Sequence, residues 1–423
     1  MRLAEALMPD HGVLNGLREQ LVDRLCAAGV LRDDRVVQAF RVVPRHLFLP
    51  EVEPERSYRD EAMVTKRSPD GWSISSSSQP TVMAVMLEQL DVGCGQHVLE
   101  IGAGTGYNAA LLTHLVGERG EVTTIDIDED LAEQARRNLT VADVRGVSVV
   151  CADGAAGWPD GAPYDRIILT VGAGDLAPAW VDQLTAGGRL LLPLSLRSVQ
   201  RTVAFEQAGD HLTSVSVAPC GFMPLRGQMA KPESIRPLRD GSGLFVNFDG
   251  ERRLDTAALY TALGHPAELL TTGIRVTPAE LFDGLALWLA LHEPDSGRLF
   301  TVGAAADLGL VPPLLPGMTS TYVLLEEQAM AALVCLDQEL DSGTSSSAFE
   351  LGVRVFGAGG HDLAQRLVGA IHQWHASGRR ATVGLRIRAY PRASDTDGDT
   401  ATVIDKHYSR LLLDWPEQSG RFT

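Results

Sequence analysis

The residues best suited to chemistry form a glycine-rich turn, in which Glu100 is followed by Gly102, Gly104 and Gly106. The turn comes after an apolar run at 97–101 and before a helical pattern. Glycines let the backbone approach a ligand closely, and the start of a helix offers free N–H groups. A tight turn with a purely structural role would need the same glycines, so the turn alone does not establish a ligand site.

The spacing of the turn and two later acids favour one cofactor. The glycines follow G-x-G-x-G with the acid Glu100 before them, whereas dinucleotide-binding turns have G-x-G-x-x-G. Asp126, followed by Ile127, ends the next apolar run, about 20 residues on, where a carboxylate can accept from both ribose hydroxyls. Asp153 and Gly154 follow a third run, where an acid can meet the adenine amine. Each acid alone is more often a helix cap or turn former, but together they predict a site for S-adenosylmethionine.

An α/β domain is expected to position these residues. Apolar runs alternate with helical patterns, which is typical of a parallel sheet covered on both faces. Such sheets bind ligands at the carboxyl ends of their strands. The predicted fold is a doubly wound, mostly parallel, seven-stranded Rossmann-like sheet of the α/β class. The expected strands are 97–101, 121–125, 147–151, 167–170, 190–193, 202–206 and 212–217, and the expected helices are 107–116, 129–139 and 178–184.

The pattern along the chain predicts four segments. Residues 1–35 form an N-terminal helical segment, and 36–228 form the cofactor-binding domain. Residues 229–243, rich in Pro, Arg and Gly, are a linker. The remainder, 244–423, is expected to be an α+β domain for substrate binding or assembly. It contains helical patterns at 281–292 and 362–377 and alternating stretches at 381–389 and 402–413, which suggest an antiparallel hairpin.

Composition excludes several other classes. The 423 residues carry a formal net charge of −17, which disfavours contact with nucleic-acid phosphates. No long apolar run or secretory signal is found, so no membrane partner and a cytoplasmic location are expected. Five cysteines without C-x-x-C spacing argue against a disulfide framework or a zinc site. His372 and His375 have no acidic partner at ligand spacing, and 395–399 lacks EF-hand spacing, so no metal is expected.

A set of short motifs between residues 35 and 228 carries a family resemblance. These motifs are 39–45 with Phe48 and Pro50, 58–60, 78–80, 98–107, Asp153-Gly154 with Gly157-Trp158, Tyr164-Asp165, 187–190 with Pro193, and 222–225. Together they resemble the protein-L-isoaspartate O-methyltransferase family. The resemblance implies methyl transfer from S-adenosylmethionine to a carboxylate of a peptide or protein carrying Asp or isoaspartate, with S-adenosylhomocysteine as product.

The resemblance also implies roles for individual residues. It assigns catalysis to Ser78, whose hydroxyl would hold the carboxylate against the methyl group. It places further residues against the substrate, namely Ser77, Gln79, Pro80, Thr170 and Val171. A carboxylate is already ionised at pH 7, so the attack needs no general base and alignment can supply most of the catalysis.

Some segments depart from the family's pattern, and the chain has an added half. The departures lie at 75–78, 170–173 and 194–195, which would touch the substrate. Long forms with such an extension resemble enzymes that tailor ribosomally synthesised peptides, such as lanthipeptides and graspetides, on an Asp, and 282–290 resembles a segment of that group. The product there is an aspartimide, because the next amide displaces methanol from the ester and closes a succinimide.

Three other functions remain open from the sequence. The first is repair of isoaspartate in aged proteins. The second is an inactive fold that only binds peptide, and the third is methylation of a small molecule. The sequence does not indicate the oligomeric state.

Overall fold

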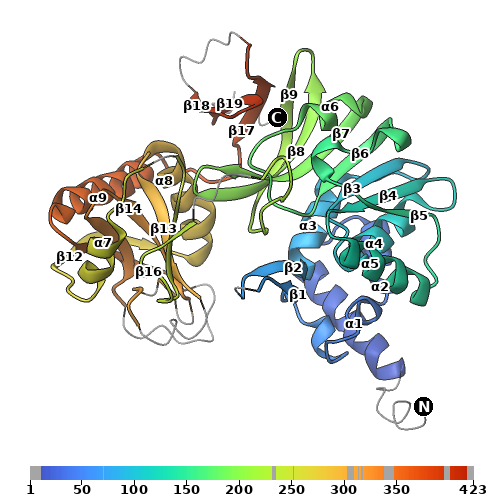
Figure 1. Cartoon of the computed structure of the whole chain (residues 1–423), viewed down its shortest axis with the longest axis horizontal. Coiled ribbons are helices and arrows are strands. Elements are labelled where there is room, and N and C mark those ends of the chain that lie inside the picture. The colour runs from blue at the N-terminus through green and yellow to red at the C-terminus, as the bar shows by residue number, and fades with distance from the viewer. Residues whose placement is uncertain are drawn as a thin grey trace, which may run out of the picture.

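The computed structural model describes residues 11–69, 71–230, 235–250, 252–302, 309–312, 314–315, 318–337, 347–394 and 401–416. Within these residues the strands form two large sheets and a separate two-stranded hairpin. The elements gather into two lobes, of which the larger lies on the right of Figure 1 and the smaller on the left. The residues 395–399, considered above as a cation loop, lie outside the described residues.

The larger lobe is built on a ten-stranded sheet in the order β18-β19-β17-β9-β8-β7-β6-β3-β4-β5. The pairs from β5 through β4, β3 and β6 to β7 are parallel, and those from β7 through β8 to β9 are antiparallel. These strands are β3 (His97–Ile101), β4 (Glu121–Asp126), β5 (Val147–Cys151), β6 (Tyr164–Leu169), β7 (Leu184–Leu196), β8 (Val199–Ala208) and β9 (His211–Cys220).

The parallel strands are apolar along their length because helices cover both faces of the sheet. Val98 belongs to one hydrophobic core with the helices that precede and follow β3. Its neighbour Leu99 belongs to a second core on the opposite face, together with Trp180. The alternation of side chains along a strand makes this division possible. The helices are α1 (His11–Ala27), α2 (Asp34–Val42), α3 (Pro80–Leu90), α4 (Tyr107–Val116), α5 (Glu129–Val141) and α6 (Pro178–Asp182).

The sheet is larger and less parallel than the sequence predicts. Strands β17 (Arg386–Pro391), β18 (Thr402–Asp405) and β19 (Ser409–Asp414) come from the end of the chain and extend it beyond β9. Pairing of β17 with β9 joins them to the larger lobe, at the top of Figure 1. The prediction of seven mostly parallel strands is therefore wrong in number. The last strands of the expected unit 244–423 pair with β9, so they belong to the sheet of the larger lobe and not to that of the smaller lobe.

The smaller lobe holds a seven-stranded sheet in the order β10-β11-β13-β14-β15-β16-β12. Its first strand, β10, lies inside the expected linker 229–243, so part of that segment belongs to the sheet of the smaller lobe. The strands are β10 (Ile235–Pro237), β11 (Leu244–Phe248), β12 (Glu268–Val276), β13 (Ser296–Thr301), β14 (Ser320–Leu325), β15 (Met330–Cys335) and β16 (Phe349–Phe356). The helices are α7 (Thr256–Leu263), α8 (Ala286–His292) and α9 (Gly360–Ala376).

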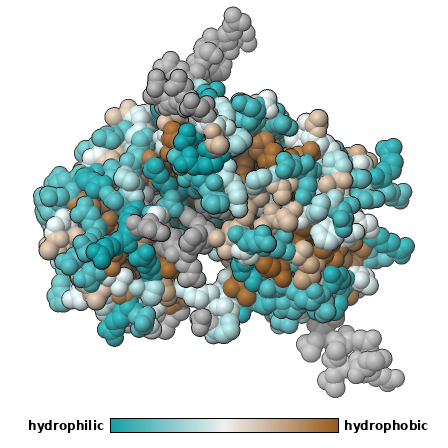
Figure 2. All heavy atoms as spheres, turned by 45° about the horizontal axis from the view of Figure 1, so that its top comes forward, coloured by the Kyte–Doolittle hydropathy of each residue, from teal (hydrophilic) through white to brown (hydrophobic). Residues whose placement is uncertain are grey.

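Helix α8 joins the two lobes. Leu287 and Leu291 lie in the core beneath the larger sheet, whereas Trp288 and Leu289 lie in the core of the smaller lobe. A helix that is apolar on all sides must be buried on all sides, which explains the uniformly apolar stretch. The expected helix 281–292 begins with a π-helical turn, Glu280–Leu285. The face shown in Figure 2 is mostly hydrophilic, with some apolar patches. No helix among the described residues is long and apolar enough to cross a membrane.

The hairpin consists of β1 (Met63–Arg67) and β2 (Ser73–Ser77), which pair only with each other among the described strands. It precedes α3 directly in the chain and reaches from the larger lobe toward the smaller one (Figure 1). The short 3₁₀ turns of the larger lobe are Arg45–Phe48, Arg56–Tyr58, Gly154–Ala156 and Pro159–Gly161.

Candidate active site

A cavity of about 310 Å³ lies at the carboxyl ends of β3, β4 and β6. This is the edge at which doubly wound sheets bind their ligands. Four segments form its walls: the glycine-rich turn, the end of the hairpin, the start of α3 and the segment that follows β9. The predicted residues in its lining are Ser77, Ser78, Gln79, Glu100, Gly102, Gly104, Asp126, Ile127, Gly154, Thr170 and Val171.

The glycine-rich turn passes along the cavity in a conformation that requires glycine. Gly102 has φ 109° and Gly106, the residue before α4, has φ 84°. A Cβ on Gly102 would lie 2.5 Å from Thr170 Oγ1 and 3.1 Å from Val171 Cγ1. Side-chain-bearing residues rarely adopt such φ values, and here they would also clash. Gly106 supports the turn from behind, since its Cβ position faces α5 rather than the cavity.

Asp126 holds the turn in place. Its carboxylate accepts hydrogen bonds from Gly104 N at 2.9 Å and from Asp128 N at 3.2 Å. The residue is 7 % exposed, and burial raises the pKa of its carboxyl. The next residue, Ile127, is 38 % exposed and offers an apolar surface at the cavity. The pair thus combines an acceptor for hydroxyls with a flat apolar contact, as expected for a nucleoside.

Two other predicted residues lie beside the cavity and not in its lining. The Asp153 carboxylate accepts from Ala155 N at 2.9 Å and from Gln228 N at 2.7 Å. Its neighbour Gly154 lines the cavity. Pro80 is the first residue of α3 and is likewise absent from the lining. The Asp153 carboxylate therefore engages two backbone N–H groups beside the cavity, and its contact with adenine stays a prediction.

The segment 221–228 crosses the mouth of the cavity, and its role was not predicted. Gly172 N donates to Met223 O at 2.7 Å, and Leu225 N donates to Gly172 O at 2.8 Å. The Arg226 guanidinium donates to both Asp128 oxygens, at 3.1 and 2.9 Å. This hydrogen bond lowers the pKa of Asp128. The motif at 222–225 entered the sequence analysis only as part of the family resemblance, and no role at the cavity was assigned to these residues.

Glu100 lies behind the glycine-rich turn and is fully buried. Its carboxylate accepts from Asn108 Nδ2 at 2.8 Å and from Thr124 Oγ1 at 2.6 Å. Burial raises the pKa of Glu100 to about 7 although both donors favour the ionised form. The residue therefore ties β3 to α4 and β4 at the floor of the cavity.

We expect Glu100→Gln to change the pH dependence of stability. The unfolded carboxyl ionises near pH 4.5 and the folded one near pH 7. A raised folded pKa means that the stabilising contribution is complete below pH 4.5 and is lost as the pH rises through 7. The unfolding free energy of the variant relative to wild type should then rise by up to about 3 kcal/mol over this interval. Urea unfolding at a series of pH values measures it, with Glu133→Gln, exposed on α5, as control. Parallel pH profiles for wild type and Glu100→Gln would contradict the expectation.

The substrate end of the cavity presents two serine hydroxyls. Ser77 is 4 % exposed, and its hydroxyl has no hydrogen-bond partner among the described residues. Ser78 is half-buried beside it in the cavity lining. Thr170 is already engaged, since its hydroxyl donates to Gly102 O at 2.7 Å. The Gln79 amide donates to Asp60 Oδ2 at 3.1 Å. The two serines are thus the donors best placed for a ligand carboxylate.

Buried Arg45 positions this end of the cavity. Its guanidinium donates to Ser78 O at 2.9 Å and lies 5.2 Å from the centre of the Tyr107 ring. Arg45 is 0 % exposed, and burial lowers the pKa of its guanidinium. Sequence reasoning included Arg45 in a motif but gave it no role. Nothing in the local pattern indicates that the chain buries this charge.

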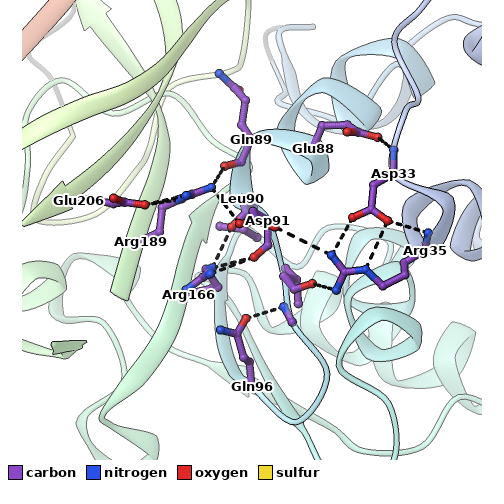
Figure 3. Close-up of polar contacts among 12 residues, drawn as sticks. Asp33, Arg35, Glu88, Gln89, Leu90, Asp91, Gln96, Arg166, Arg189 and Glu206 are labelled. Atoms are coloured by element: carbon purple, nitrogen blue, oxygen red, sulfur yellow. Dashed lines mark hydrogen bonds and ion pairs between the residues drawn. The ribbon is translucent and has the colours of Figure 1, made fainter. Parts of the chain in front are cut away.

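Helix α3 is fixed at both ends, which holds Ser78 in place. At its start, the Asp60 carboxylate accepts from Thr81 N at 2.8 Å and acts as a distant cap. At its carboxyl end, Arg166 donates to Leu90 O at 2.8 Å and Arg189 donates to Gln89 O at 2.7 Å. Figure 3 shows these arginines converging on the helix end, where cations also suit the helix dipole.

The histidines that the sequence analysis considered as metal ligands and the arginines of the second half contact neighbouring protein groups. His372 Nε2 lies 2.8 Å from Thr272 O, and His375 bonds Arg379. Arg386 and Arg388 pair with Asp414. Within the described ranges, no three His, Cys, Asp or Glu side chains converge as metal ligands.

The doubly wound sheet and the cavity at its carboxyl edge define a nucleotide-binding α/β protein. The family model described as Protein-L-isoaspartate(D-aspartate) O-methyltransferase matches residues 16–230. The chain therefore belongs to this family, and it is an S-adenosylmethionine-dependent protein-L-isoaspartate O-methyltransferase.

Relatives and solved structures cover different shares of the chain. The protein-L-isoaspartate O-methyltransferase of Methanopyrus kandleri is 39 % identical over 229 residues, 53 % of this chain and 99 % of the relative. That of Thermotoga maritima is 40 % identical over 189 residues, 45 % and 59 % of the two chains. A solved structure of a protein-L-isoaspartate O-methyltransferase covers 88 % of this chain and 96 % of its own, at 24 % identity and a TM-score of 0.49. One from Plasmodium falciparum, in complex with S-adenosyl-L-homocysteine, covers 49 % and 98 %, at 17 % identity and 0.44.

The residues at the cavity fit S-adenosylmethionine. The glycine-rich turn leaves the wall free of side chains where a Cβ would intrude. Asp126 would hold the ribose hydroxyls, and Ile127 would contact the adenine face. The hydroxyl of Ser77, which has no hydrogen-bond partner among the described residues, lies in the hairpin wall of the same cavity.

Proposed function

We propose that this protein methylates the carboxylate of an Asp or isoaspartyl residue in a dedicated, ribosomally synthesised peptide, and that the resulting methyl ester closes to a succinimide. The observation that carries the proposal is the contact of the second lobe with the hairpin that forms the substrate wall. Trp72, in the hairpin turn, packs edge-on against Phe245 and Phe300 of the smaller lobe, with ring centres 4.7 and 6.5 Å away. The added half thus contacts the hairpin that, in this proposal, selects the substrate.

The residues present suit a reaction that needs alignment more than acid–base catalysis. Bound S-adenosylmethionine supplies an electrophilic methyl group on a sulfonium. Ser77 and Ser78 donate hydrogen bonds to the substrate carboxylate and hold one oxygen in line with that methyl group. A carboxylate oxygen held in this way would accept the methyl carbon as the carbon–sulfur bond breaks and its electron pair stays on sulfur. No proton is transferred, because the carboxylate is ionised at pH 7.

Succinimide formation then needs no further group from the protein. The amide nitrogen of the next residue in the peptide attacks the ester carbonyl, and methanol leaves with the amide proton. The substrate side of the cavity departs from the family's pattern at 75–78, which favours a substrate other than aged proteins in general. Work on a ribosomally made peptide before its export would place the enzyme in the cytoplasm.

Repair of isoaspartate is the second candidate. It is favoured by the 39 % identity over 229 residues with a protein named for isoaspartate methylation. The family model matches residues 16–230, so repair would leave the smaller lobe to assembly or regulation.

Mass spectrometry separates the two candidates. The enzyme and S-adenosylmethionine are incubated in parallel with a generic isoaspartyl peptide and with an Asp-containing precursor peptide encoded beside this gene. We expect the precursor first to gain a methyl group. Loss of methanol should then leave a product that is lighter than the starting peptide by the mass of one water. Methylation of the isoaspartyl peptide with none on the precursor would overturn the proposal in favour of repair. If neither peptide is methylated, the protein is a fold that binds peptide without catalysis.

Replacement of Ser78 by Ala should slow turnover without weakening cofactor binding. A hydrogen bond to a charged group contributes about 1.5–3 kcal/mol, so kcat should fall about 10- to 100-fold. Ser78 lies at the hairpin side of the cavity, so the dissociation constant of S-adenosylhomocysteine should stay within about twofold. Steady-state kinetics and calorimetry measure the two quantities. Ser73→Ala, at the other end of β2 and outside the cavity lining, is the matched control. A kcat close to wild type would assign the role to Ser77 instead.

A further inference from the structure

The β1–β2 hairpin cannot hold its position by itself. It forms a two-stranded sheet that shares no strand pairing with either large sheet among the described residues. Its ladder is irregular, with register shifts at Lys66 on β1. Isolated two-stranded hairpins are at best marginally stable in water. Contacts outside the hairpin must therefore decide where Ser77 and Ser78 lie relative to the cavity.

Three anchors fix the hairpin, one at its base, one at its side and one at its tip. At the base, Arg45 donates to Ser78 O at 2.9 Å. At the side, Lys66 Nζ lies 2.8 Å from an Asp128 oxygen and 2.7 Å from an Asp130 oxygen. Both of these anchors join the hairpin to the larger lobe. Only the third anchor, at the tip, joins it to the smaller lobe.

The tip anchor is an aromatic cluster. Trp72 is held in the turn by its own backbone, since Ser68 N donates to Trp72 O at 2.7 Å and Trp72 N donates to Ser68 Oγ at 3.1 Å. Its ring meets Phe245 edge-on at 4.7 Å, and Phe245 stacks on Phe300 at 5.7 Å. Phe245 and Phe300 are themselves paired across β11 and β13, so they form a rigid platform.

We propose that Trp72 is a positioning residue, through which the smaller lobe sets the position of the hairpin and hence of Ser77 and Ser78 against the substrate carboxylate. The inference rests on the proposed function only in placing the carboxylate at these serines. It gives the added half of the chain a part in the methyl transfer, because the hairpin that it holds forms the substrate wall of the cavity. Among the described residues the ring contacts of Trp72 are with Phe245 and Phe300, so the nucleoside wall formed by Asp126 and the glycine-rich turn should be unaffected.

The test compares Trp72→Ala with Trp72→Phe, using an isoaspartyl peptide as substrate. Loss of one aromatic pair corresponds to about a tenfold change, so Trp72→Ala should raise the KM for the peptide about tenfold. Trp72→Phe keeps a ring on the platform and should stay within about threefold of wild type. The dissociation constant of S-adenosylhomocysteine should stay within about twofold, as for a distant site. Hydrogen exchange should accelerate at 73–77 and not in the parallel strands.

A second variant changes the same contact from the other lobe. Phe300→Ala should reproduce the effect of Trp72→Ala, and the double variant should be no worse than either single one. If Trp72→Ala does not fold, Phe300→Ala with Trp72→Phe tests the same contact. An unchanged peptide KM in Phe300→Ala, or an equal loss of S-adenosylhomocysteine affinity, would overturn the inference. The variants are compared with the wild-type protein on an isoaspartyl peptide. The effect of Trp72 on the KM can therefore be measured even if the precursor peptide is not methylated.

Discussion

Gly102→Ala is expected to abolish useful cofactor binding, with the dissociation constant of S-adenosylhomocysteine raised about 100-fold or more. A strained backbone at positive φ costs of order 1–3 kcal/mol, and each 1.36 kcal/mol is a factor of ten. The new Cβ would also lie 2.5 Å from Thr170 Oγ1, which must move and give up its hydrogen bond to the Gly102 carbonyl. Both effects displace the wall that the nucleoside contacts.

Isothermal titration calorimetry with S-adenosylhomocysteine measures this loss, and Gly187→Ala is the matched control. Gly187 also has positive φ, 80°, but no neighbouring atom lies within 4 Å of its Cβ position. It belongs to β7, away from the cavity lining. The control should lose stability from backbone strain but keep its affinity within about twofold. Equal affinities for Gly102→Ala and wild type would show that the turn does not form the cofactor wall.

The local pattern was sufficient to predict that Asp126 and the glycine-rich turn lie together, and their role in holding the cofactor stays a prediction. Strand–helix alternation placed Asp126 and the glycine-rich turn at one edge of a parallel sheet, and the structure brings them together there. Such predictions succeed because a strand buried on both faces must be apolar throughout, and because only glycine accepts the backbone angles of the turn. The information is therefore contained in a few consecutive residues.

The arrangement of the second half depends on contacts between distant segments. An alternating strand such as β17 has the same pattern whether it pairs with its own hairpin or with β9, so its place in the larger sheet could not be predicted. The apolar stretch of α8 predicted a buried helix but not that two lobes bury it. Likewise, the sequence does not indicate that the distant Gln228 N donates a hydrogen bond to the Asp153 carboxylate.

Arg45→Met is expected to lower kcat/KM about 100-fold while the protein remains at least as stable. The guanidinium is fully buried and makes no ion pair among the described residues, and its Nε has no hydrogen-bond partner. Desolvating such a charge is costly, so an apolar side chain of similar length should be neutral or stabilising by about 1 kcal/mol or more. Activity should nevertheless fall, because the hydrogen bond to Ser78 O is lost and the start of α3 is no longer fixed against the hairpin.

Kinetics and thermal unfolding of Arg45→Met and Arg45→Lys together test this expectation. Lys keeps a charge and a donor but not the planar fork, so it should retain part of the activity at a lower stability than Met. If Arg45→Met is more stable than wild type but has lost turnover, then Arg45 serves to position Ser78 and does not stabilise the fold. If instead Arg45→Met unfolds at a lower temperature and loses activity in proportion, the buried guanidinium serves the fold, and Ser78 is positioned by α3 and the hairpin without it.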